Sequence, residues 1–389
     1  MSQSISNLGQ LFSPLQVGYI VDPIEPLSAN SDVTWVLETI ADKPEWNVVP
    51  IERDGVVLGV VARKVLEELA GSAWSRFWQK DLDAYLIPAR ETIEASTYIG
   101  KVVDNSLRNV QGEETFWFVV QHRRSYLGVI SLQKMLEYTN TLRSQDLIKA
   151  GEIQSNLLRK SHINDSRISL LFYNQMAHEI GGDFYRVFKS GPDRYLVACF
   201  DVAGKNISGS MATMALGACF SSMELFKYDA SAEQITQFIN ALVRDVNPPG
   251  VFVTALLFYV DFSTRAVKIH NCGFSPVHIF VPQEAKKVAY TVAQPSYPPL
   301  GIQEDLELNS DQIVPIVKGL RITAYSDGLT DMADIFGERY GEEKTVKLIK
   351  LFHTLPQNGI PKDMDKEIRR WIGEASLADD ITLVDMRFN

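Results

Sequence analysis

The sequence is poor in cysteine, in positive charge and in long apolar runs, and each shortage excludes a class of protein. Three cysteines occur in 389 residues, and no pair of them has the spacing of a zinc site. Lys and Arg total 38 against 48 Asp and Glu, and this net charge of −10 argues against nucleic acid as a partner. The longest apolar run, residues 251–260, is about half of a membrane span. We therefore expect a cytoplasmic protein with no disulfide framework, no nucleic-acid partner and no membrane partner.

Several catalytic motifs are also missing. The sequence contains no P-loop, no glycine-rich kinase loop followed by a lysine strand, and no Gly-x-Ser-x-Gly of a serine hydrolase. The lone Ser208-Gly209-Ser210 precedes an expected helix and is more simply a helix cap. Because no protein nucleophile is offered, water has to attack the substrate in a hydrolytic reaction.

Aspartates beside apolar, strand-like runs are the most informative positive feature. They are Asp183 in Glu-Ile-Gly-Gly-Asp-Phe-Tyr, Asp201 in Cys-Phe-Asp-Val-Ala-Gly-Lys, Asp327 in Tyr-Ser-Asp-Gly, and Asp379 with Asp380 in Ala-Asp-Asp-Ile-Thr. Carboxylates near the ends of buried strands cost free energy unless a positive group gathers them. Mg²⁺ and Mn²⁺ prefer oxygen ligands and would do so as a pair. One such Asp is usually a turn former or a cap, but the set predicts metal-assisted hydrolysis.

The first 138 residues contain a weak internal duplication. A strand–turn–strand–helix pattern at 48–69, which includes Gly59, returns at 116–138, where Gly128 takes the same place. Residues 27–33 and 93–99 look like short strands that lead into N-capped helices. A unit too small to bury its own face is expected to pack against its second copy as a pseudo-symmetric pair.

This pattern resembles a tandem pair of CBS domains over about residues 16–138. The resemblance implies an adenine nucleotide as the ligand. The positions where the CBS pattern carries Ser or Thr and then a ribose-binding Asp hold Ala62 and Val65 in the first copy. In the second copy they hold Ser131 and Lys134, so neither copy has the carboxylate, and this departure counts against the nucleotide.

Between the two halves, apolar residues recur without proline from Leu136 to Leu158, which predicts one continuous helix. Two interpretations stay open: a connector packed on its own domain, and a parallel coiled coil that joins two subunits as a homodimer. Gly151 would weaken the helix by about 1 kcal/mol relative to Ala. The expected domains are a flexible N-terminus at 1–15, a CBS-like module at 16–138, the linker helix at 139–162 and a catalytic domain at 163–389.

The last part of the chain reads as strands mixed with a few long helices, an α+β domain. Such a mixture suggests sheets packed face to face with helices outside. Strands are expected at 168–173, 182–189, 195–201, 251–261, 266–272, 277–281, 319–326 and 381–387. Helices are expected at 210–226, 232–246, 342–354 and 362–372.

The order of the motifs over about residues 150–389 resembles the PPM family of metal-dependent protein phosphatases, in its bacterial SpoIIE and stress-regulator branch. Besides the aspartates, the resemblance rests on Glu152-Ile153-Gln154, Leu157-Leu158, Phe252-Val253-Thr254, Asn271-Cys272-Gly273, Pro299-Leu300-Gly301 and Gly337-Glu338-Arg339-Tyr340-Gly341. It implies a β-sandwich flanked by helices (αββα).

The resemblance also implies a role for each aspartate. Asp201 would bridge two Mn²⁺ or Mg²⁺ ions, helped by the backbone carbonyl of Val202. Asp183 would bind or orient water on the second ion, and Asp327 would ligate the first. Asp379 aligns with the family's remaining Asp, and Asp380 would be its supporting neighbour, although the two could be exchanged.

Three departures accompany these roles. Gly182 replaces a glutamate of eukaryotic relatives, so the second ion is expected to bind weakly. Phe274 stands where the family often has His, which would alter the rim of the site. Lys205 would either meet the substrate phosphate or be a solvated loop lysine.

The function implied is a metal-dependent phosphatase that hydrolyses phosphoserine or phosphothreonine on a partner protein. By resemblance the partner is an anti-sigma-factor antagonist of the STAS type, and the N-terminal module regulates the activity. Two alternatives stay open: a catalytically idle signalling scaffold, and a nucleotide-sensing binding module.

Overall fold

The structure is a computed structural model that describes residues 11–71, 82–108, 116–158, 163, 165–204, 207–247, 250–310 and 312–389. Residues 1–10 of the expected flexible N-terminus, the end of the expected linker helix at 159–162, and Lys205 lie outside the described residues. The chain divides into two compact units, Met1–Gln145 and Asp146–Asn389. Among the described helices, none combines the length and the apolar character needed to span a lipid bilayer.

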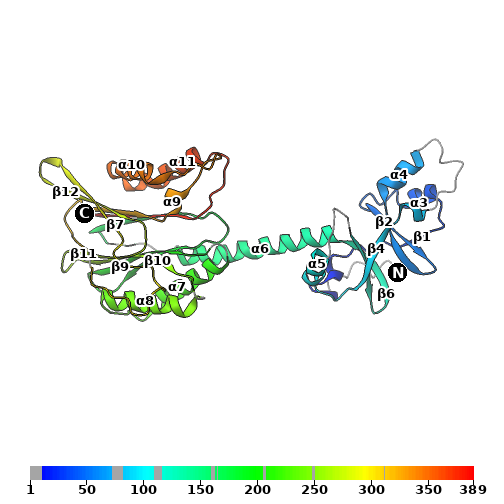
Figure 1. The fold of residues 1–389 in the computed structure, drawn as a ribbon, viewed down its shortest axis with the longest axis horizontal. Helices are drawn as coiled ribbons and strands as arrows, with labels where there is room; N and C mark the ends of the chain where they lie inside the picture. The colour runs from blue at the N-terminus through cyan, green and yellow to red at the C-terminus, as the bar shows by residue number, and fades with distance from the viewer. Residues whose placement is uncertain are drawn as a thin grey trace. The chain divides into compact units, whose positions relative to one another are not determined.

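The first unit is built around one six-stranded sheet with the order β1-β2-β3-β4-β5-β6 (Figure 1). Its elements are α2 (Val17–Ile20), β1 (Leu27–Ser28), α3 (Val33–Thr39), β2 (Val48–Arg53), β3 (Val56–Ala62), α4 (Arg63–Gly71), η2 (Leu82–Tyr85), β4 (Ile87–Glu94), α5 (Ile99–Leu107), β5 (Trp117–His122) and β6 (Ser125–Ser131). The helix α6 (Leu132–Leu158) follows β6 directly and ends in the second unit. The helix expected after the second copy and the expected linker helix are therefore one element.

In each copy of the repeat, the segment that precedes it in the chain pairs with the hairpin of the other copy. Asp22, ahead of the first copy, forms an antiparallel bridge with Val129 in the hairpin of the second. The start of β4, ahead of the second copy, pairs with β3 of the first. The equivalent glycines Gly59 and Gly128 permit both approaches, because a Cβ there would lie 2.2 Å and 2.1 Å from the carbonyl oxygens of Ile87 and Asp22.

Three local expectations for this unit have different outcomes in the structure. Asp32 caps α3 as predicted, since its carboxylate accepts hydrogen bonds from the backbone N–H groups of Thr34 (2.8 Å) and Trp35 (3.3 Å). The cap predicted for α5 is wrong: Tyr98 takes the N-cap position, and it makes no side-chain hydrogen bond to the helix. Phe12 is buried in the core against Gly18, so packed structure begins inside the range expected to be flexible.

The second unit is a sandwich of two five-stranded sheets between two layers of helices. Figure 1 shows α7 and α8 over one sheet and α10 and α11 over the other. The first sheet has the order β14-β11-β10-β9-β8 and the second β13-β12-β15-β16-β7. The strands are β7 (Ile168–Gln175), β8 (Asp183–Lys189), β9 (Arg194–Val202), β10 (Val253–Asp261), β11 (Ala266–Cys272), β12 (Val277–Pro282), β13 (Val288–Ala293), β14 (Gln312–Pro315), β15 (Arg321–Tyr325) and β16 (Ile381–Phe388). The helices are α7 (Ile207–Leu225), α8 (Ala232–Val246), η3 (Glu284–Lys286), α9 (Gly328–Asp331), α10 (Gly341–Thr354), η4 (Gln357–Gly359) and α11 (Ile360–Ile372).

This arrangement confirms the expected α+β sandwich, and the sequence missed two of its strands. The missed strands, β13 and β14, are both edge strands: β13 has no fully buried residue, and β14 has one. A short edge strand buries too few apolar residues to leave a clear alternation in the sequence. Central strands such as β9 are covered on both faces, and for this reason they read as continuous apolar runs.

Candidate functional site

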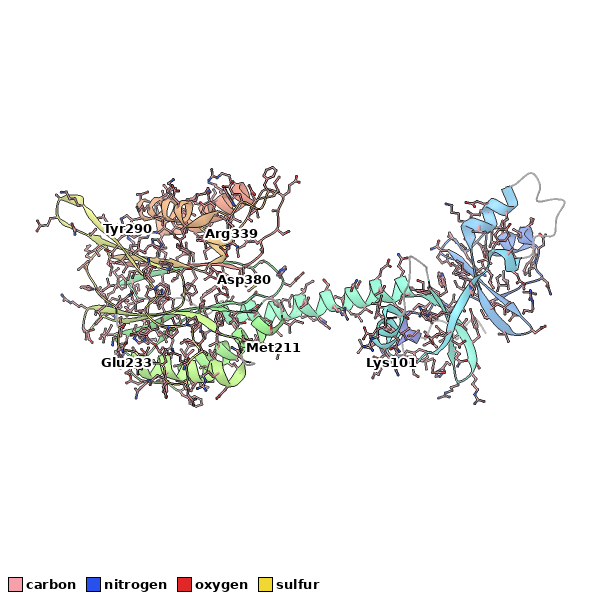
Figure 2. The ribbon with its side chains drawn as sticks, in the orientation of Figure 1. Lys101, Met211, Glu233, Tyr290, Arg339 and Asp380 are labelled. Atoms are coloured by element: carbon pink, nitrogen blue, oxygen red, sulfur yellow. The ribbon has the colours of Figure 1, made fainter. Side chains whose placement is uncertain are left out.

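The two sheets bring the expected aspartates to one end of the sandwich. Asp183 begins β8 and faces Asp201, near the end of β9, as its direct partner in the antiparallel pair. Asp327 directly follows Ser326 after β15, while Asp379 and Asp380 immediately precede β16. Since β15 and β16 are hydrogen-bonded neighbours, the carboxylates of Asp327, Asp379 and Asp380 lie at the same end of the second sheet. Figure 2 shows Asp380 and Tyr290 at opposite ends of this unit.

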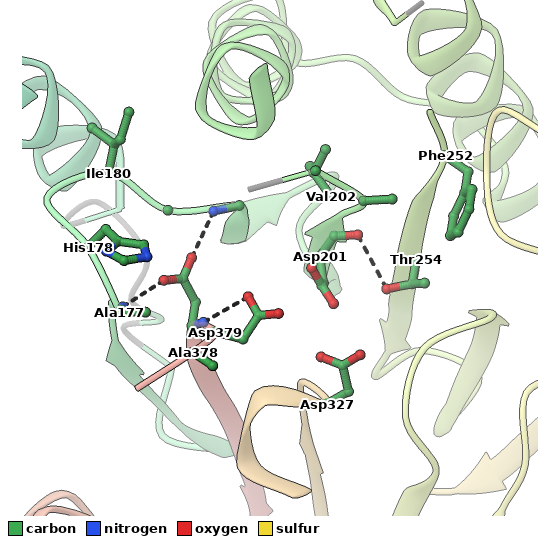
Figure 3. A pocket seen from close by; sticks show the side chains of 15 residues that line it. Ala177, His178, Ile180, Asp201, Val202, Phe252, Thr254, Asp327, Ala378 and Asp379 are labelled. Carbon is green, nitrogen blue, oxygen red and sulfur yellow. Dashed lines mark hydrogen bonds between the residues drawn. The ribbon is translucent and has the colours of Figure 1, made fainter. Parts of the chain in front are cut away.

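A pocket of about 210 Å³ lies at this end of the sandwich. Its lining is Ala177, His178, Ile180, Gly181, Gly182, Asp201, Val202, Ala203, Gly204, Phe252, Thr254, Asp327, Ala378, Asp379 and Asp380. Figure 3 shows the carboxylates of Asp201, Asp327 and Asp379 turned toward a common space. Five of the six residues expected at the site thus line one pocket, and the sixth, Asp183, is buried beside Asp201 with 2% of its surface exposed.

Asp380 organises the backbone of the loop before β8. Its Oδ1 accepts a hydrogen bond from the N–H of Ala177 (2.8 Å), and its Oδ2 accepts from Gly182 (2.7 Å) and Asp183 (3.3 Å). Gly181 makes room for this carboxylate, because a Cβ there would lie 2.2 Å from Oδ2. Asp379 has a different environment: it is half-buried in the pocket, and its Oδ1 accepts from the N–H of Asp380 (3.0 Å).

Ser326 links the two sheets beneath the pocket. Its Oγ donates to Oδ2 of Asp183 (2.8 Å) and accepts from the N–H of Thr382 (2.9 Å). Ser326 was not among the residues expected at the site from the sequence. The available signal was its place in Tyr-Ser-Asp-Gly, where a buried hydroxyl between a core strand and a carboxylate needs a partner.

Burial and mutual repulsion raise the pKa values of the two central carboxyls. Burial, followed by the charges of Asp327, Asp379 and Asp380, raises the pKa of Asp201 from 3.8 to about 7. The pKa of Asp183 lies well above its usual range, first because of its burial and then because of the charge of Asp201. Near neutral pH, ionisation of these groups is therefore opposed by the fold.

This environment fits a divalent cation. The possible metal donors are carboxylate oxygens together with the carbonyl oxygen of Val202. Gly182 leaves space beside this carbonyl, since a Cβ at Gly182 would lie 3.2 Å from its oxygen. Hard cations such as Mg²⁺ and Mn²⁺ take such oxygen ligands. Within the described ranges, no group of three or more His, Cys, Asp or Glu side chains is arranged as a ready-made metal site. The fit therefore rests on the chemistry of the donors and on the repulsion that a cation would relieve.

The C-terminal part of α6 contacts the loop that forms one wall of the pocket. Gln154 is buried, and its amide donates to the carbonyl of Gly181 (2.7 Å) and to Oγ1 of Thr213 in α7 (2.8 Å). Its Oε1 accepts from the N–H of Gly181 (3.0 Å). One side chain thereby joins α6, α7 and the loop that leads into Asp183.

The expectation for Phe274 is wrong. Its side chain is buried in the core between the two sheets, and its N–H donates to Oδ1 of Asn271 (2.9 Å), so it shapes a turn and does not form the rim. The described rim residues on the first sheet include Phe252 and Thr254. Thr254 pairs with Asp201 across β9 and β10 and donates to its backbone carbonyl (3.3 Å).

Two curated proteins resemble this chain in sequence. The chain is 26% identical over 200 residues to phosphoserine phosphatase RsbP of Bacillus subtilis, a match that covers 49% of this chain and 46% of RsbP. It is 23% identical over 298 residues to protein IcfG of Synechocystis sp., covering 68% of this chain and 44% of IcfG. The chain thus spans less than half the length of these curated relatives.

The fold has a counterpart among solved structures. The SiaA-PP2C domain of Pseudomonas aeruginosa superimposes with a TM-score of 0.54 at 20% identity, and the match covers 64% of this chain and 99% of that domain. Residues 191–389, which include β9, β15, β16 and the aspartates that adjoin them, match the family described as stage II sporulation protein E. With half of its length matched, the chain belongs to the stage II sporulation protein E (SpoIIE) family.

Proposed function

We propose that this protein is a metal-dependent phosphatase that hydrolyses phosphoserine or phosphothreonine on a partner protein. The observation that carries the proposal is the convergence of Asp201, Asp327 and Asp379 on one pocket in a member of the SpoIIE family. The name of the relative RsbP, phosphoserine phosphatase, supports the same activity.

The proposed cofactor is a pair of Mn²⁺ or Mg²⁺ ions. The groups that would hold the ions are the carboxylates of Asp201, Asp327 and Asp379 and the carbonyl of Val202, with Asp183 buried beside Asp201. Bound ions would neutralise charge on the phosphoryl oxygens and lower the pKa of a coordinated water. Asp380 is assigned a positioning task instead, since three backbone N–H groups already occupy its oxygens.

The protein's own groups would prepare this reaction. Asp380 holds the loop at Gly182, and Ser326 orients the carboxylate of Asp183. Thr254 pairs with Asp201 and fixes the end of β9. Water then attacks phosphorus, and the bond from phosphorus to the serine or threonine oxygen breaks.

The activity is tested with purified protein, p-nitrophenyl phosphate and a phosphoserine peptide. Phosphate release is expected with Mn²⁺ or Mg²⁺ and none with EDTA. Asp201→Asn should lower the rate by more than about 100-fold, the loss that removal of even an outer-shell metal partner can cause. Full turnover by this variant, or wild-type turnover in EDTA, would rule out the proposed chemistry.

The proposed protein substrate is a phosphorylated STAS-type anti-sigma-factor antagonist, as the resemblance to the stress-regulator branch implies. Incubation with phosphorylated STAS proteins and analysis by mass spectrometry tests this choice. Release of phosphate from unrelated phosphoproteins but from none of the STAS proteins would contradict it.

Regulation is proposed to pass from the N-terminal unit through α6. The helix starts directly after β6, and near its C-terminal end Gln154 contacts the pocket loop, which supports such coupling. Ile148 and Ile153 of α6 are 49% and 54% exposed, which supports self-association as a homodimer through this helix. Equal activity of the whole chain and of a chain that starts at residue 139 would contradict the regulatory coupling, whereas the dimer through α6 is tested by a substitution in the helix itself.

An adenine nucleotide is the ligand that the CBS-like resemblance implies for the N-terminal unit. Lys134, which stands where a ribose-binding carboxylate is usual, forms an ion pair with Asp22. Calorimetry of the whole chain with ATP, ADP and AMP tests the proposal, and no heat with any of the three would remove it.

A further inference from the structure

One residue that lines the pocket has no role in the chemistry described so far. Among the described residues of the lining, the ionisable ones are Asp201, Asp327, Asp379, Asp380 and His178. His178 alone among these can carry a positive charge. Histidine is also the side chain that exchanges a proton most readily near neutral pH.

We infer that His178 is the general acid that protonates the leaving oxygen of the serine or threonine side chain. The inference rests on the proposed phosphatase function and adds a catalytic residue to it. An alkoxide is a poor leaving group, so a proton donor at this oxygen accelerates the bond cleavage.

The backbone around His178 is held in place while its side chain stays accessible. The N–H of the preceding residue, Ala177, is bonded to Asp380, and Ile180 two residues later is buried. Both the N–H and the carbonyl of Gly181 are hydrogen-bonded to the side chain of Gln154. The side chain of His178 is itself exposed, as a group that must regain its proton from solvent requires.

The position of His178 also suits the direction of the reaction. Figure 3 shows His178 on one side of the pocket and Asp201 with Thr254 on the opposite side. In phosphoryl transfer the attacking and leaving oxygens lie roughly in line through phosphorus. If water attacks from the side of Asp201, the leaving oxygen departs toward the side of His178.

The proton balance is complete without another reactant. The oxygen of water forms a bond to phosphorus, and the bond between phosphorus and the seryl oxygen breaks with its electron pair on that oxygen. The imidazolium of His178 gives its proton to the seryl oxygen, which leaves as the alcohol. One proton of the attacking water stays on the inorganic phosphate, and the other returns to the imidazole through solvent.

Leaving groups of different basicity test the inference. p-Nitrophenolate is a stable anion and needs no proton, whereas the serine oxygen does. We expect His178→Gln to lower kcat on a phosphoserine peptide by about 100-fold or more, within the range for a lost general acid. The loss on p-nitrophenyl phosphate should be at least ten times smaller. An equal loss on the two substrates, or no loss on the peptide, would overturn the inference.

A second variant separates proton transfer from charge. His178→Lys keeps the positive charge but binds its proton more tightly, so it should lose peptide turnover as His178→Gln does. Peptide turnover by His178→Lys at the wild-type rate would overturn the inference, because charge alone would then suffice.

Two controls keep the outcome unambiguous. Glu179→Gln changes the exposed neighbour outside the pocket lining and should keep both activities. The rise in melting temperature with Mn²⁺, a readout independent of turnover, should be the same in His178→Gln and wild type. A smaller rise in the variant would show that His178 serves metal binding and would overturn the inference. A wild-type protein inactive on both substrates refutes the proposed function itself, an outcome distinct from a change in the ratio.

Discussion

Gly151 of α6 lies so close to Glu179 that a Cβ at this position would be 2.1 Å from the Glu179 carbonyl oxygen. One turn later, Gln154 bonds both the N–H and the carbonyl of Gly181. The helix and the pocket loop are thus in direct backbone-level contact. A glycine that lowers helix propensity is explained by the approach that it allows.

Replacement of Gly151 by alanine should break this contact. In an open helix the change stabilises by about 1 kcal/mol, but overpacking here should destabilise by about 1–3 kcal/mol. The displaced loop carries Gly182 and leads into Asp183, so the affinity for Mn²⁺ should fall as well. Urea denaturation and a Mn²⁺ titration followed by melting temperature measure the two effects.

Gly100→Ala is the matched control. Gly100 lies in α5, and a Cβ there would meet no atom within 4 Å, so alanine should stabilise by about 1 kcal/mol. If Gly151→Ala stabilised the protein to the same extent, the tight contact with Glu179 would be refuted.

The metal-free protein should lose stability as the pH rises. The folded pKa of Asp201 is raised from 3.8 to about 7, so its contribution is fully present below pH 3.8 and is lost as the pH rises toward 7. In EDTA, the melting temperature of wild type relative to that of Asp201→Asn should therefore fall between pH 4 and pH 8. Calorimetry across this range measures the difference.

Mn²⁺ should reverse this loss in wild type and leave Asp201→Asn unchanged. At a free ion concentration 100 times the dissociation constant, binding stabilises the folded state by about 2.7 kcal/mol. An equal shift in the variant would show that Asp201 is not a ligand. A difference in EDTA that rises with pH would contradict the electrostatic argument.

Asp379→Asn and Asp380→Asn should impair different properties of the protein. Asp380 accepts from three backbone N–H groups, and each donor left unsatisfied costs about 1–3 kcal/mol, so its variant should lose stability in EDTA. Asp379 accepts from the N–H of Asp380, its immediate neighbour, and is half-buried in the pocket, so its variant should keep most stability and lose Mn²⁺ affinity. Urea titrations and metal titrations of both proteins decide this, and the reverse pattern would exchange their assigned tasks.

Ile148→Glu should weaken self-association if α6 forms the proposed dimer. Ile148 is 49% exposed, so in the single chain the substitution should change stability little. Sedimentation velocity of the whole chain should show a shift from dimer to monomer. Lys149→Gln, an exposed neighbour, serves as the control. A dimer that is unaffected by Ile148→Glu would place the interface elsewhere.

Much of the second unit was predictable because its signals are local. The strand Ala266–Cys272 and the helix Ala232–Val246 have the predicted ends. Their apolar periodicity and the turn residues that flank them can be read from each segment and its immediate neighbours. The carboxylates were conspicuous for a related reason: a charged group beside an apolar run is unfavourable without a partner.

Contacts between residues that are far apart in the sequence were not predictable. Ser326 bonds Asp183 from 143 residues away, and Gly181 and Gly328 are required because the side chain and the backbone of Asp380 approach them. Phe274 was placed at the rim by resemblance to the family alone, but its position follows from the packing of the two sheets. Such contacts depend on which distant segments the fold brings together, and the local sequence pattern of a segment does not identify its tertiary neighbours.

The amino-acid sequence by itself determined the kind of site: oxygen donors on several strands, the absence of a protein nucleophile, and a helix between two differently built halves. Tertiary structure alone decided the division of labour, with Asp380 holding backbone, Asp379 facing the pocket, and His178 opposite Asp201. The physical reason is that a residue's chemistry is carried by its side chain, whereas its task depends on the neighbours that folding brings within hydrogen-bond distance.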